Sequence, residues 1–467
     1  MVFDFEIIIS GDTLKFQRRF LIISKDNQIT AKQATSKFIE EMNIKARKLG
    51  MLNSNFVNVQ GFYHDDHVST PRDIALMMLE SKGYKDMMRI MGRRNLECEI
   101  EGENARRIKA ITTIENSSVD DNYTVLASKT GRIPRVSTNL AIIAETKNEN
   151  TSFLGVVFKG RTRYEGMRQL FDIGNTVIHS KTEVVSHELM FKNGNFDFGD
   201  KYWKNNSGSF KLDFKDYYTY PASYVATSRG TSTQIHTGRL NFIPGHKYYV
   251  SCMVKCTRYE SGTLGFQFTA IEEYETVGLQ RVSDGWEKIS GVYTAEEGSS
   301  LSRVYFGGIN KADLDGRIDN VTIIDLTKVY GEGEEPSKSE MNKHVYHDLS
   351  ADNGLVIKMP QTSIPYNFEN LHVLFEKDSE SLGYPASLTK LLTAMVFLDN
   401  FSDLDQKLTL RQSDIKSGSG TKFKTGDIIL LRDALNMMLV ESSNSIAAAF
   451  ARLAGEQLIL RDRKNFE

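Results

Sequence analysis

The stretch that most constrains this chain runs from residue 384 to residue 398 and reads YPASLTKLLTAMVFL. It is typical of the start of a helix, with Ser387 in the first turn and Lys390 three residues later. Residues three apart lie on one face of a helix, so the lysine amine can reach the serine hydroxyl above the positive end of the helix dipole. Apolar neighbours such as Leu391 would lower the pKa of Lys390, and a neutral amine can take the serine proton. The stretch therefore predicts a serine nucleophile with a lysine base.

The S-x-x-K pair also has a simple alternative explanation, because many amphipathic helices carry one by chance. Two later segments favour the catalytic interpretation. Residues 418–435, GSGTKFKTGDIILLRDAL, contain a K-x-G-D turn, and residues 438–450, MLVESSNSIAAAF, place an S-x-N triplet before an alanine-rich helix. With these companions, residues 372–455 resemble the serine-type D-alanyl-D-alanine carboxypeptidases, the low-molecular-weight penicillin-binding proteins of peptidase family S11.

The same family carries a third motif, K-T-G, on a strand beside the nucleophile. Residues 424–426 have these letters but coincide with the K-x-G-D turn, so we do not assign them this role. Residues 125–131, VLASKTG, supply the motif instead, and residues 154–174 resemble the strand and helix that close the family's domain. Residues 56–78 resemble the family segment F-x-N-x-x-G-L followed by H-x-S-T-A-x-D-M-A-L. The two halves of the family's domain thus occur in swapped order.

The swapped order predicts a circular permutation. In the family, the helix after S-x-N is followed by one that resembles residues 36–51, which here lie near the amino terminus. Permutation is tolerated where the old termini lie close together and the new ones fall in an exposed connection. A second arrangement stays open, a homo-oligomer in which each chain supplies half of a site that its neighbour completes.

The resemblance implies an α+β fold of the penicillin-binding and beta-lactamase-like transpeptidase type. It implies a serine carboxypeptidase that cleaves D-Ala-D-Ala stem peptides of peptidoglycan through an acyl-enzyme, with neither a cofactor nor a metal ion. The implied catalytic residues are the nucleophile Ser387, its base Lys390, the proton relay Ser442, and Asn444, which would orient Lys390 and the substrate amide. The implied substrate-binding residues, which would hold the terminal carboxylate, are Lys129, Thr130, Gly131 and Arg161.

Two positions depart from the family pattern. Ser445 follows the S-x-N asparagine where the family usually has aspartate, and Arg132 begins an RIPR turn where the family has an aromatic, threonine-rich one. Two alternatives to an enzyme therefore stay open. One is a catalytically inactive penicillin-binding fold that binds cell wall, and the other is a structural component of a phage tail or baseplate.

Residues 180–330 change character to short strands separated by glycine, serine and asparagine turns, which predicts an all-β jelly-roll sandwich. The motifs NGNF at 193–196 and IDNV at 318–321 resemble carbohydrate-binding modules of the jelly-roll type. That resemblance implies recognition of a cell-wall glycan, because exposed aromatic faces stack on sugar rings. The candidate stacking residues are Trp203, Tyr217, Tyr218, Tyr220 and Trp286. A core or edge role is the alternative for each of them.

The remaining segments complete a multidomain organisation. Residues 1–31 alternate with period two around a Gly11-Asp12 turn, which predicts a β-hairpin that packs on the chain itself or on a partner. Residues 325–336, DLTKVYGEGEEP, resemble the end of sandwich modules in phage tail proteins, which implies other virion tail proteins as partners. The predicted segments are the hairpin at 1–31, the K-T-G half at 32–175, the sandwich at 180–330, a charged linker at 331–345 and the S-x-x-K half at 346–467.

Charge and hydropathy argue against two classes of partner. A net charge of -2 provides no general field for nucleic acid, and no stretch approaches the roughly 18 apolar residues of a membrane span. The amino terminus has no basic region before its apolar residues, so no export signal is visible. We therefore expect the protein in a virion, a phage tail, or facing the cell wall from outside the cell.

Neither the cysteines nor the paired histidines predict a metal site. Cys252 and Cys256 are spaced to share one face of a strand, and Cys98 stands alone, which is typical of core thiols. His64 and His67 are close in sequence without a third ligand, so we expect both in a solvated loop.

Overall fold

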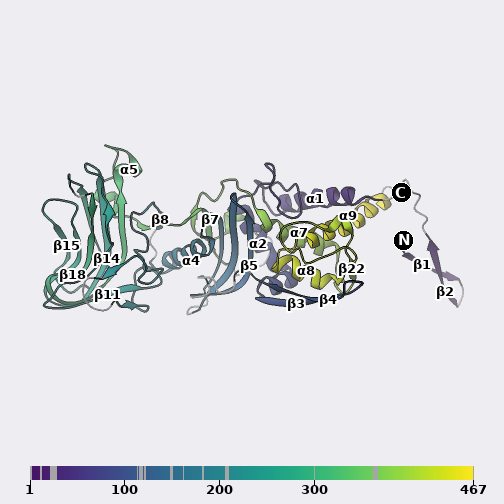
Figure 1. Ribbon diagram of the computed structural model, residues 1–467, viewed down its shortest axis with the longest axis horizontal. Coiled ribbons are helices and arrows are strands. Elements are labelled where there is room, and N and C mark those ends of the chain that lie inside the picture. Colours follow the sequence, from purple (N-terminus) through teal and green to yellow (C-terminus); the bar gives the residue numbers. More distant parts are fainter. Residues whose placement is uncertain are drawn as a thin grey trace.

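The computed structural model describes residues 3–10, 13–20, 29–112, 114, 119, 122–147, 151–160, 162–180, 184–205, 210–298, 300–360 and 366–465. Figure 1 shows three parts along the long axis of the molecule. A β-sandwich lies at one end, a mixed part of sheet and helices lies in the middle, and a two-stranded hairpin lies beyond it. We call residues 29–180 and 345–465 the central part and residues 189–330 the sandwich. The chain is therefore multidomain, with mixed α and β structure.

One antiparallel sheet runs through the central part and combines strands from distant stretches of the chain. Its order is β21-β20-β7-β6-β5. β20 pairs with β7 so that Leu355 lies opposite Val156. Both residues are buried, and helices cover both faces of the sheet, which explains the nearly continuous apolar sequences of these strands. The strands are β5 Tyr123–Ile133, β6 Ser137–Thr146, β7 Ser152–Gly160, β20 Ala351–Lys358 and β21 Val373–Lys377.

The helices divide between the two faces of this sheet. α4, Arg163–Ser180, packs on one face, where Phe171 joins a core with Phe153 of β7. The other face carries a larger core formed by the remaining helices. These are α1 Ala31–Lys48, α2 Pro71–Glu80, α3 Lys85–Met91, α7 Thr389–Asn400, α8 Leu431–Val440 and α9 Asn444–Asn465, with short 3-10 turns at Ser81–Gly83, Phe368–Asn370, Ala386–Leu388 and Gln412–Asp414. Two small pairs, β3 Asn95–Ile100 with β4 Arg106–Ile111 and β22 Lys407–Thr409 with β23 Ile428–Leu430, complete the central part.

Local sequence signals begin the helices of this part. The Thr70 side chain accepts a hydrogen bond from the Asp73 amide, and Pro71 occupies the first helical position of α2. Thr30 caps α1 in the same way and forms a capping box with Gln33. Threonine caps and an initial proline are favourable because the first amides of a helix have no partner within it.

The first and last helices of the central part pack directly on each other. Gly455 of α9 faces α1 so closely that a Cβ would lie 1.9 Å from the Ala34 carbonyl oxygen. Lys37 of α1 forms an ion pair of 3.0 Å with Asp462 of α9. Figure 1 shows the two helices side by side. Two segments at opposite ends of the described central part are therefore neighbours in space.

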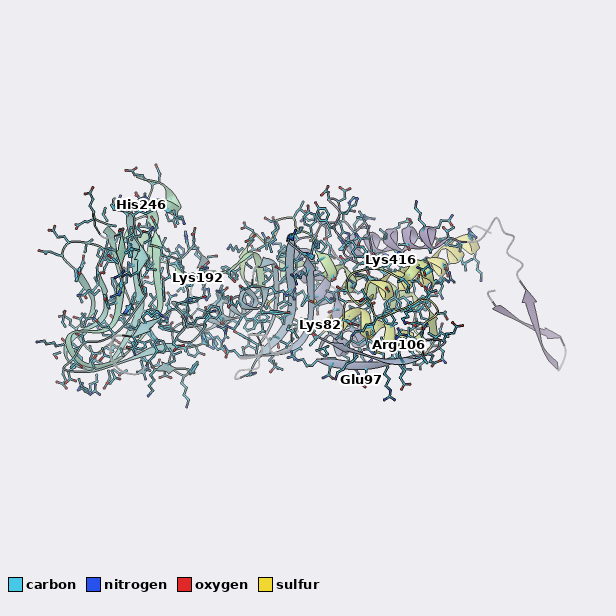
Figure 2. All side chains as sticks on the ribbon, in the orientation of Figure 1. Lys82, Glu97, Arg106, Lys192, His246 and Lys416 are labelled. Atoms are coloured by element: carbon cyan, nitrogen blue, oxygen red, sulfur yellow. The ribbon has the colours of Figure 1, made fainter. Side chains whose placement is uncertain are left out.

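An ion pair also connects residues 29–180 to residues 345–465 near the small strand pairs β3–β4 and β22–β23. Arg106 of β4 donates to both carboxylate oxygens of Asp427, at 2.9 and 2.6 Å, and Asp427 is fully buried. Glu101 and Ile428 exchange two backbone hydrogen bonds beside this pair. Figure 2 shows Arg106 at this edge of the central part. The contacts between the two stretches thus extend beyond the main sheet.

The sandwich is built on two 22-residue strands, β14 Lys247–Phe268 and β18 Val304–Asp325, which pair along their length. Interruptions in the register, such as that between Ser251 and Met253, are bulges that bend a strand pair. Its buried core contains large aromatic side chains such as Phe306. The shorter strands are β9 Lys204–Asn205, β10 Leu212–Asp213, β11 Ser223–Arg229, β12 Thr233–His236, β13 Leu240–Asn241, β15 Glu275–Leu279, β16 Glu287–Thr294 and β17 Leu301–Ser302.

Two connections join the sandwich to the central part. They lie side by side as the parallel strands β8, Val184–Ser186, and β19, Val345–His347. The return connection also contains the short helices α5, Leu326–Tyr330, and α6, Lys338–Met341. The sandwich is therefore attached through a pair of hydrogen-bonded strands.

The amino-terminal strands β1, Phe3–Ser10, and β2, Thr13–Phe20, pair antiparallel. Within the described residues of the whole chain, no helix is long and apolar enough to cross a membrane.

Candidate active site

Ser387 lies at the entrance of α7, in the 3-10 turn Ala386–Leu388. Lys390 follows in the first turn of α7, and its side chain is fully buried. The lysine amine donates a hydrogen bond of 2.9 Å to the Ser387 hydroxyl. Ser387 itself is partly exposed, so the pair joins a buried amine to an accessible hydroxyl.

The surroundings of Lys390 favour its neutral form. Its second hydrogen bond goes to the Gln60 carbonyl oxygen, which accepts from the amine at 2.8 Å. Burial, and then the charge of Lys129, lower the pKa of Lys390 well below its ordinary value. A neutral amine beside a hydroxyl is the arrangement that general-base activation of a serine requires.

A second lysine and serine pair lies close to the first. Lys129 of β5 donates to the Ser442 hydroxyl and to the Thr130 carbonyl oxygen, each at 3.0 Å. Ser442 stands between α8 and α9 in the left-handed region, with a φ of 66°. Burial, and then the charge of Arg163, lower the pKa of Lys129 to about 7. A lysine that titrates near neutral pH can both hold an anion and exchange a proton.

Two glycines let neighbouring segments approach the nucleophile turn. A Cβ on Gly131 of β5 would lie 2.7 Å from the Pro385 carbonyl oxygen. Gly61 has a φ of 83°, and a Cβ there would lie 1.8 Å from the Ala386 carbonyl oxygen. Only glycine fits at such close approaches of backbone to backbone. The K-T-G strand and the loop at 56–67 therefore both contact the turn that carries Ser387.

Gln60 is a site residue that motif reasoning missed, because it acts through its backbone carbonyl. Asn58 shapes this turn: its side-chain oxygen accepts from the amides of Gly61 and Phe62 at 2.8 and 2.9 Å. An asparagine three residues before a glycine is typical of such a side-chain-stabilised turn. That spacing is the signal in the sequence, although it does not say which carbonyl faces the site.

Asn444, which the sequence predicts to orient Lys390, uses its amide on a different neighbour. Its Nδ2 donates to the Ser417 carbonyl oxygen at 2.8 Å, and its backbone N–H donates to the Ser419 carbonyl oxygen at 3.0 Å. Gly418 between them has a φ of 92°, and a Cβ there would lie 2.7 Å from Asn444 Nδ2. In this structure Asn444 therefore holds the loop 416–420 beside the site.

Arg161 lies outside the described residues, and Arg163 at the start of α4 is the arginine that contacts the K-T-G strand. Its Nη1 donates to the Gly131 carbonyl oxygen at 3.4 Å, and its guanidinium lies 4.9 Å from the ring centroid of Tyr164. Its charge contributes to the lowered pKa of Lys129. Lys129 of the K-T-G strand and Arg163 beside it thus provide two cationic groups, an arrangement that suits a carboxylate.

Comparison with known proteins bears on these segments. Residues 29–162 and 363–458 match one family model. The family is Peptidase S11, D-alanyl-D-alanine carboxypeptidase. The matched segments contain every peptidase residue predicted above, from Lys129 to Asn444, and leave out residues 163–362.

Two curated proteins are similar to parts of the chain. A stretch of 99 residues is 35% identical to the D-alanyl-D-alanine endopeptidase of Haemophilus influenzae and covers 21% of this chain and 34% of that protein. A stretch of 82 residues is 35% identical to the D-alanyl-D-alanine endopeptidase of Pseudomonas aeruginosa and covers 17% and 26%, respectively. The chain thus spans about a third or less of the length of these relatives.

Solved structures also resemble part of the chain. The CBM22-1 xylan-binding domain of Paenibacillus barcinonensis Xyn10C is 20% identical with a TM-score of 0.22 and covers 26% of this chain and 83% of that one. The enzymatically active domain of bacteriophage CBA120 tailspike protein 4 is 13% identical with a TM-score of 0.22 and covers 29% and 21%.

His67 corrects the expectation of a solvated loop, because its ring is buried. Its Nδ1 accepts from the Val57 N–H at 3.1 Å, so its Nε2 carries the ring proton and donates to the Thr389 hydroxyl at 2.8 Å. Burial, and then the charge of His64, lower the pKa of His67 to about 4. A neutral His67 thus links the loop 56–67 to the start of α7. In the described part of the chain, no three His, Cys, Asp or Glu side chains gather as ligands for a metal ion.

The second K-T-G sequence, at residues 424–426, lies in an exposed turn before β23. The Lys424 N–H donates to Asp427 at 2.8 Å, and the Thr425 hydroxyl donates to Gln412 at 2.8 Å. These contacts are those of a surface turn and do not involve the two lysine and serine pairs.

Two of the five predicted sugar-stacking residues have no exposed ring face. Trp203 is 6% exposed, stacks on Phe196 with ring centroids 5.3 Å apart, and donates its indole N–H to the Asn193 carbonyl oxygen. Tyr220 is 8% exposed and packs against Tyr123 of the central part, with ring centroids 6.0 Å apart. The prediction that these two bind sugar is wrong, because aromatic rings buried in a core cannot stack on a ligand.

The other three aromatic residues are partly exposed. Tyr217 packs edge-on against Tyr220 with ring centroids 5.6 Å apart. Tyr218 and Trp286 lie beside each other with ring centroids 6.2 Å apart. These two rings are the remaining adjacent pair among the predicted residues.

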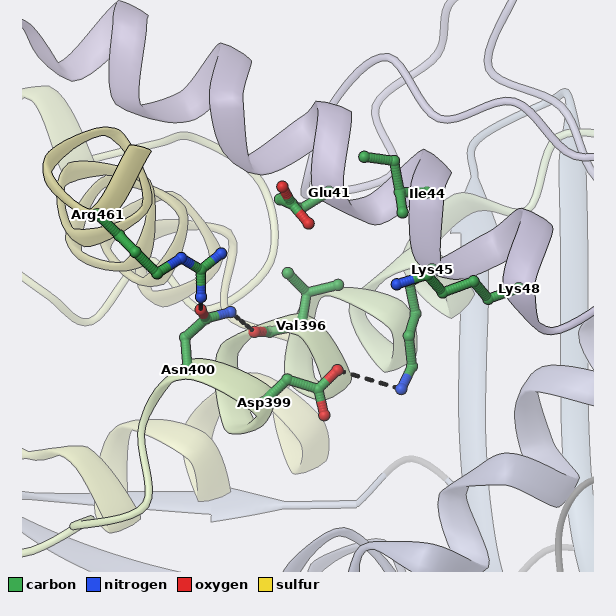
Figure 3. Close-up of a pocket in the computed structure, with 8 residues that line it drawn as sticks. All are labelled: Glu41, Ile44, Lys45, Lys48, Val396, Asp399, Asn400 and Arg461. Carbon is green, nitrogen blue, oxygen red and sulfur yellow. Dashed lines mark hydrogen bonds and ion pairs between the residues drawn. The ribbon is translucent and has the colours of Figure 1, made fainter. Parts of the chain in front are cut away.

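A surface pocket lies between α1, α7 and α9 (Figure 3). An ion pair of 3.1 Å between Lys45 and Asp399 crosses it. Its lining residues are Glu41, Ile44, Lys45, Lys48, Val396, Asp399, Asn400 and Arg461. None of the predicted peptidase residues lines this pocket, so we assign it no part in the chemistry.

Proposed function

We propose that this chain is a serine D,D-peptidase that cleaves D-Ala-D-Ala stem peptides of peptidoglycan through an acyl-enzyme. The observation that carries the proposal is the contact between the Lys390 amine and the Ser387 hydroxyl, with the amine buried and its pKa lowered. The family match and the two relatives support the same chemistry. Its substrate implies a location that faces the cell wall.

In the first step, Ser387 Oγ attacks the carbonyl carbon of the penultimate D-alanine while its proton passes to Lys390 Nζ. The backbone N–H of Ser387 and one N–H of β5 stabilise the resulting oxyanion, and loss of one such donor typically costs on the order of a hundredfold in rate. The C–N bond then breaks and leaves the acyl group on Ser387 as an ester, while Ser442, hydrogen-bonded to Lys129, passes a proton to the leaving amine and regains one from Lys390. Water then hydrolyses the ester and regenerates the Ser387 hydroxyl.

We assign the carboxylate of the leaving residue to Lys129, Thr130 and Arg163. Charge-assisted hydrogen bonds from these groups would fix the leaving residue, and Gly131 would let the substrate backbone lie along β5. A terminal D-alanine makes the reaction a carboxypeptidase one, which the description of the matched family supports. The alternative is an endopeptidase reaction, in which the leaving residue belongs to a second, cross-linked stem peptide. The names of the two relatives favour this alternative.

We also propose that the central part is a circular permutation of the family's domain. The close packing of α1 on α9 supports this, because the family order would run from one into the other. The sandwich interrupts the chain between α4 and β20, at a point where both connections lie side by side. Pairing of β7 with β20 brings strands from both halves into one sheet, as a permuted domain requires.

For the sandwich, we propose a glycan-binding role through Tyr218 and Trp286, whose partly exposed rings lie beside each other. Attachment to a phage tail stays a prediction from the sequence of residues 325–336. An inactive wall-binding protein and a tail scaffold are the alternatives to an enzyme.

The test of the enzyme proposal is labelling of the intact protein with a fluorescent penicillin. We expect covalent labelling that is lost in Ser387→Ala, slowed in Lys129→Ala and retained in the control Ser381→Ala, which changes an exposed serine in the preceding turn. A wild-type protein that is folded by circular dichroism but takes no label would contradict the proposal. Sedimentation with purified peptidoglycan would then separate the wall-binding alternative from the scaffold.

Purified stem peptides distinguish the two peptidase activities. We expect D-alanine to be released from a pentapeptide in a reaction that needs Ser387. Cleavage confined to cross-linked dimers would show an endopeptidase instead.

A further inference from the structure

A cluster of buried polar side chains lies where the sandwich meets the central part. Asp172 belongs to α4 and is 0% exposed, and Asp197 belongs to the first turn of the sandwich and is 6% exposed. The two carboxyl groups face each other across the junction within hydrogen-bonding range. A contact of two acids at a buried interface requires an explanation, because buried like charges repel each other strongly.

Asp172 has neighbours on its own side of the junction, whereas the neighbour of Asp197 comes from the opposite side. The Tyr123 hydroxyl of β5 donates to Asp172 Oδ1 at 2.6 Å. Arg168 of α4 comes no closer to Asp172 than 3.7 Å, and its guanidinium lies 4.3 Å from the ring centroid of Phe198. His347 Nε2 of β19, which belongs to the central part, lies 3.3 Å from Asp197 Oδ2 across the junction.

Two oxygen atoms of the pair have no hydrogen-bond donor among the described residues. They are Asp172 Oδ2 and Asp197 Oδ1, one from each acid, and the nearby Arg168 Nε and both ring nitrogens of His347 also have no hydrogen-bond partner there. Buried acceptors of this kind are nearly always satisfied in folded proteins. If one carboxyl group is protonated, its O–H is a donor for the other acid, so a single proton supplies the missing hydrogen bond between the two residues.

The net charge of the buried cluster also indicates a single bound proton. With the His347 ring uncharged, Asp172 and Asp197 would carry two negative charges and Arg168 one positive charge. One additional proton makes this buried group neutral, which is the state that a site of low polarity favours.

We propose that Asp172 and Asp197 share one proton across the junction and that this proton holds the sandwich against the central part, so that docking weakens as the pH rises. The proposal does not depend on the peptidase activity. It makes the orientation of the sandwich relative to Ser387 a function of pH.

The direction of the effect follows from the pKa of the pair. Burial, and then the charge of Asp197, raise the pKa of Asp172 well above its usual range. When the two parts separate, both acids return to water, where aspartate loses its proton at about pH 4. Above that pH the docked form binds one proton more than the separated form. Docking is therefore strongest at low pH. The equilibrium constant for docking falls by up to about tenfold per pH unit until the pH passes the raised pKa.

Other charged groups near the pair are few in the described structure. Arg168 on α4, Tyr123 on β5 and His347 on β19 face it directly. The charges of Lys192 and His347 act on Asp348, which follows His347 in the chain. Of these, His347 is the group that could supply a proton in place of the acids, so the experiment includes a variant that removes it.

The Tyr220 backbone amide reports on docking directly, because it donates to the Thr176 hydroxyl of α4 across the junction at 3.2 Å. Hydrogen–deuterium exchange of this amide in the intact protein, corrected for the intrinsic exchange rate, measures how often the junction opens. We expect its protection to fall as the pH rises above about 4, by up to about tenfold per unit, until the pH passes the raised pKa of Asp172. In Asp197→Asn, where an amide N–H replaces the shared proton, we expect protection that does not change with pH.

Control variants make the result specific. Asp284→Asn removes an exposed acid of the sandwich and should keep the wild-type dependence on pH, and His347→Gln should keep it as well. Asp172→Asn is the second variant of the pair and should abolish the dependence if Asp197→Asn does not fold. Protection in the wild type that is constant with pH would overturn the proposal. Loss of the dependence in His347→Gln would also overturn it and assign the proton to the histidine.

Discussion

Two buried lysines dominate the candidate site at the scale of single residues. Burial is the largest cause of the lowered pKa of both Lys390 and Lys129, and the charge of Lys129 lowers the pKa of Lys390 further. Only one of the two amines then needs to be charged at neutral pH. The site can thereby hold a base for Ser387 and a cation for the substrate within the same small volume.

The pKa of Lys129 predicts how acylation depends on pH. We expect the second-order rate constant for acylation of the free protein by penicillin to fall above pH about 7, because Lys129 loses its proton and its attraction for the carboxylate. Lys129→Gln should lower this constant and remove the alkaline limb, since glutamine does not titrate. An unchanged limb in Lys129→Gln would show that another group causes it.

A comparison of two glycines separates backbone strain from steric conflict. Gly61 and Gly426 have nearly the same φ, 83° and 85°, but a Cβ on Gly61 meets the Ala386 carbonyl oxygen and one on Gly426 meets nothing within 4 Å. We expect Gly426→Ala to cost roughly 1 to 2 kcal/mol of unfolding free energy and to keep penicillin labelling. Gly61→Ala should cost more and abolish labelling, and urea unfolding measures both costs. Equal effects of the two changes would contradict the proposed contact at Ala386.

The sequence predicts contacts between residues that are close in the chain and misses those made by distant backbone. Ser387 and Lys390 touch because their spacing alone brings them together on a helix. The Gln60 carbonyl oxygen reaches Lys390 through the packing of a segment 330 positions away, which no side-chain pattern at either place specifies. The prediction that Trp203 binds sugar is wrong for a related reason. A tryptophan suits both a buried core and a sugar-binding face, and only the fold determines which of the two it occupies.

At the scale of elements, local patterns predict the type of structure better than its partners. Turn-rich alternation predicts an all-β segment, and the strands from β9 to β18 form one. The same pattern does not reveal that β14 and β18 each run for 22 residues, because bulges let a strand bend and continue past apparent turns. The neighbours of β20 also depend on the whole fold, since β7 is nearly 200 residues earlier in the chain.

Adjacent arginines on β4 test the junction between the small strand pairs. We expect Arg106→Ala to reduce the free energy of unfolding by roughly 1 to 3 kcal/mol, because it leaves the buried Asp427 without its cation. Arg107→Ala removes an exposed pair with Glu99 and should cost at most about 1 kcal/mol. Chemical denaturation of the two variants gives the comparison. Similar losses in both would show that the buried pair contributes nothing particular.

At the scale of the whole molecule, the order of segments can be changed without changing their contacts. We expect a reordered chain, residues 184–465 joined by a flexible linker to residues 29–180, to fold and to take penicillin label. The prediction rests on the packing of α9 against α1, which brings the new joint within the reach of a short linker. The test compares penicillin labelling of the reordered and the original chain, with circular dichroism to check that each is folded. The control is the original chain with the same linker added at its end. An unfolded reordered chain would argue against the permutation.

The paired strands β8 and β19 have a mechanical consequence for the sandwich. A domain at the end of a chain is attached by one covalent connection, so a single protease cut releases it. This sandwich is held by two, so a cut in either strand leaves it attached through the other. Force applied to it through a bound surface would likewise divide between two backbones, of which one leads to α4 and the other to β20 of the central sheet.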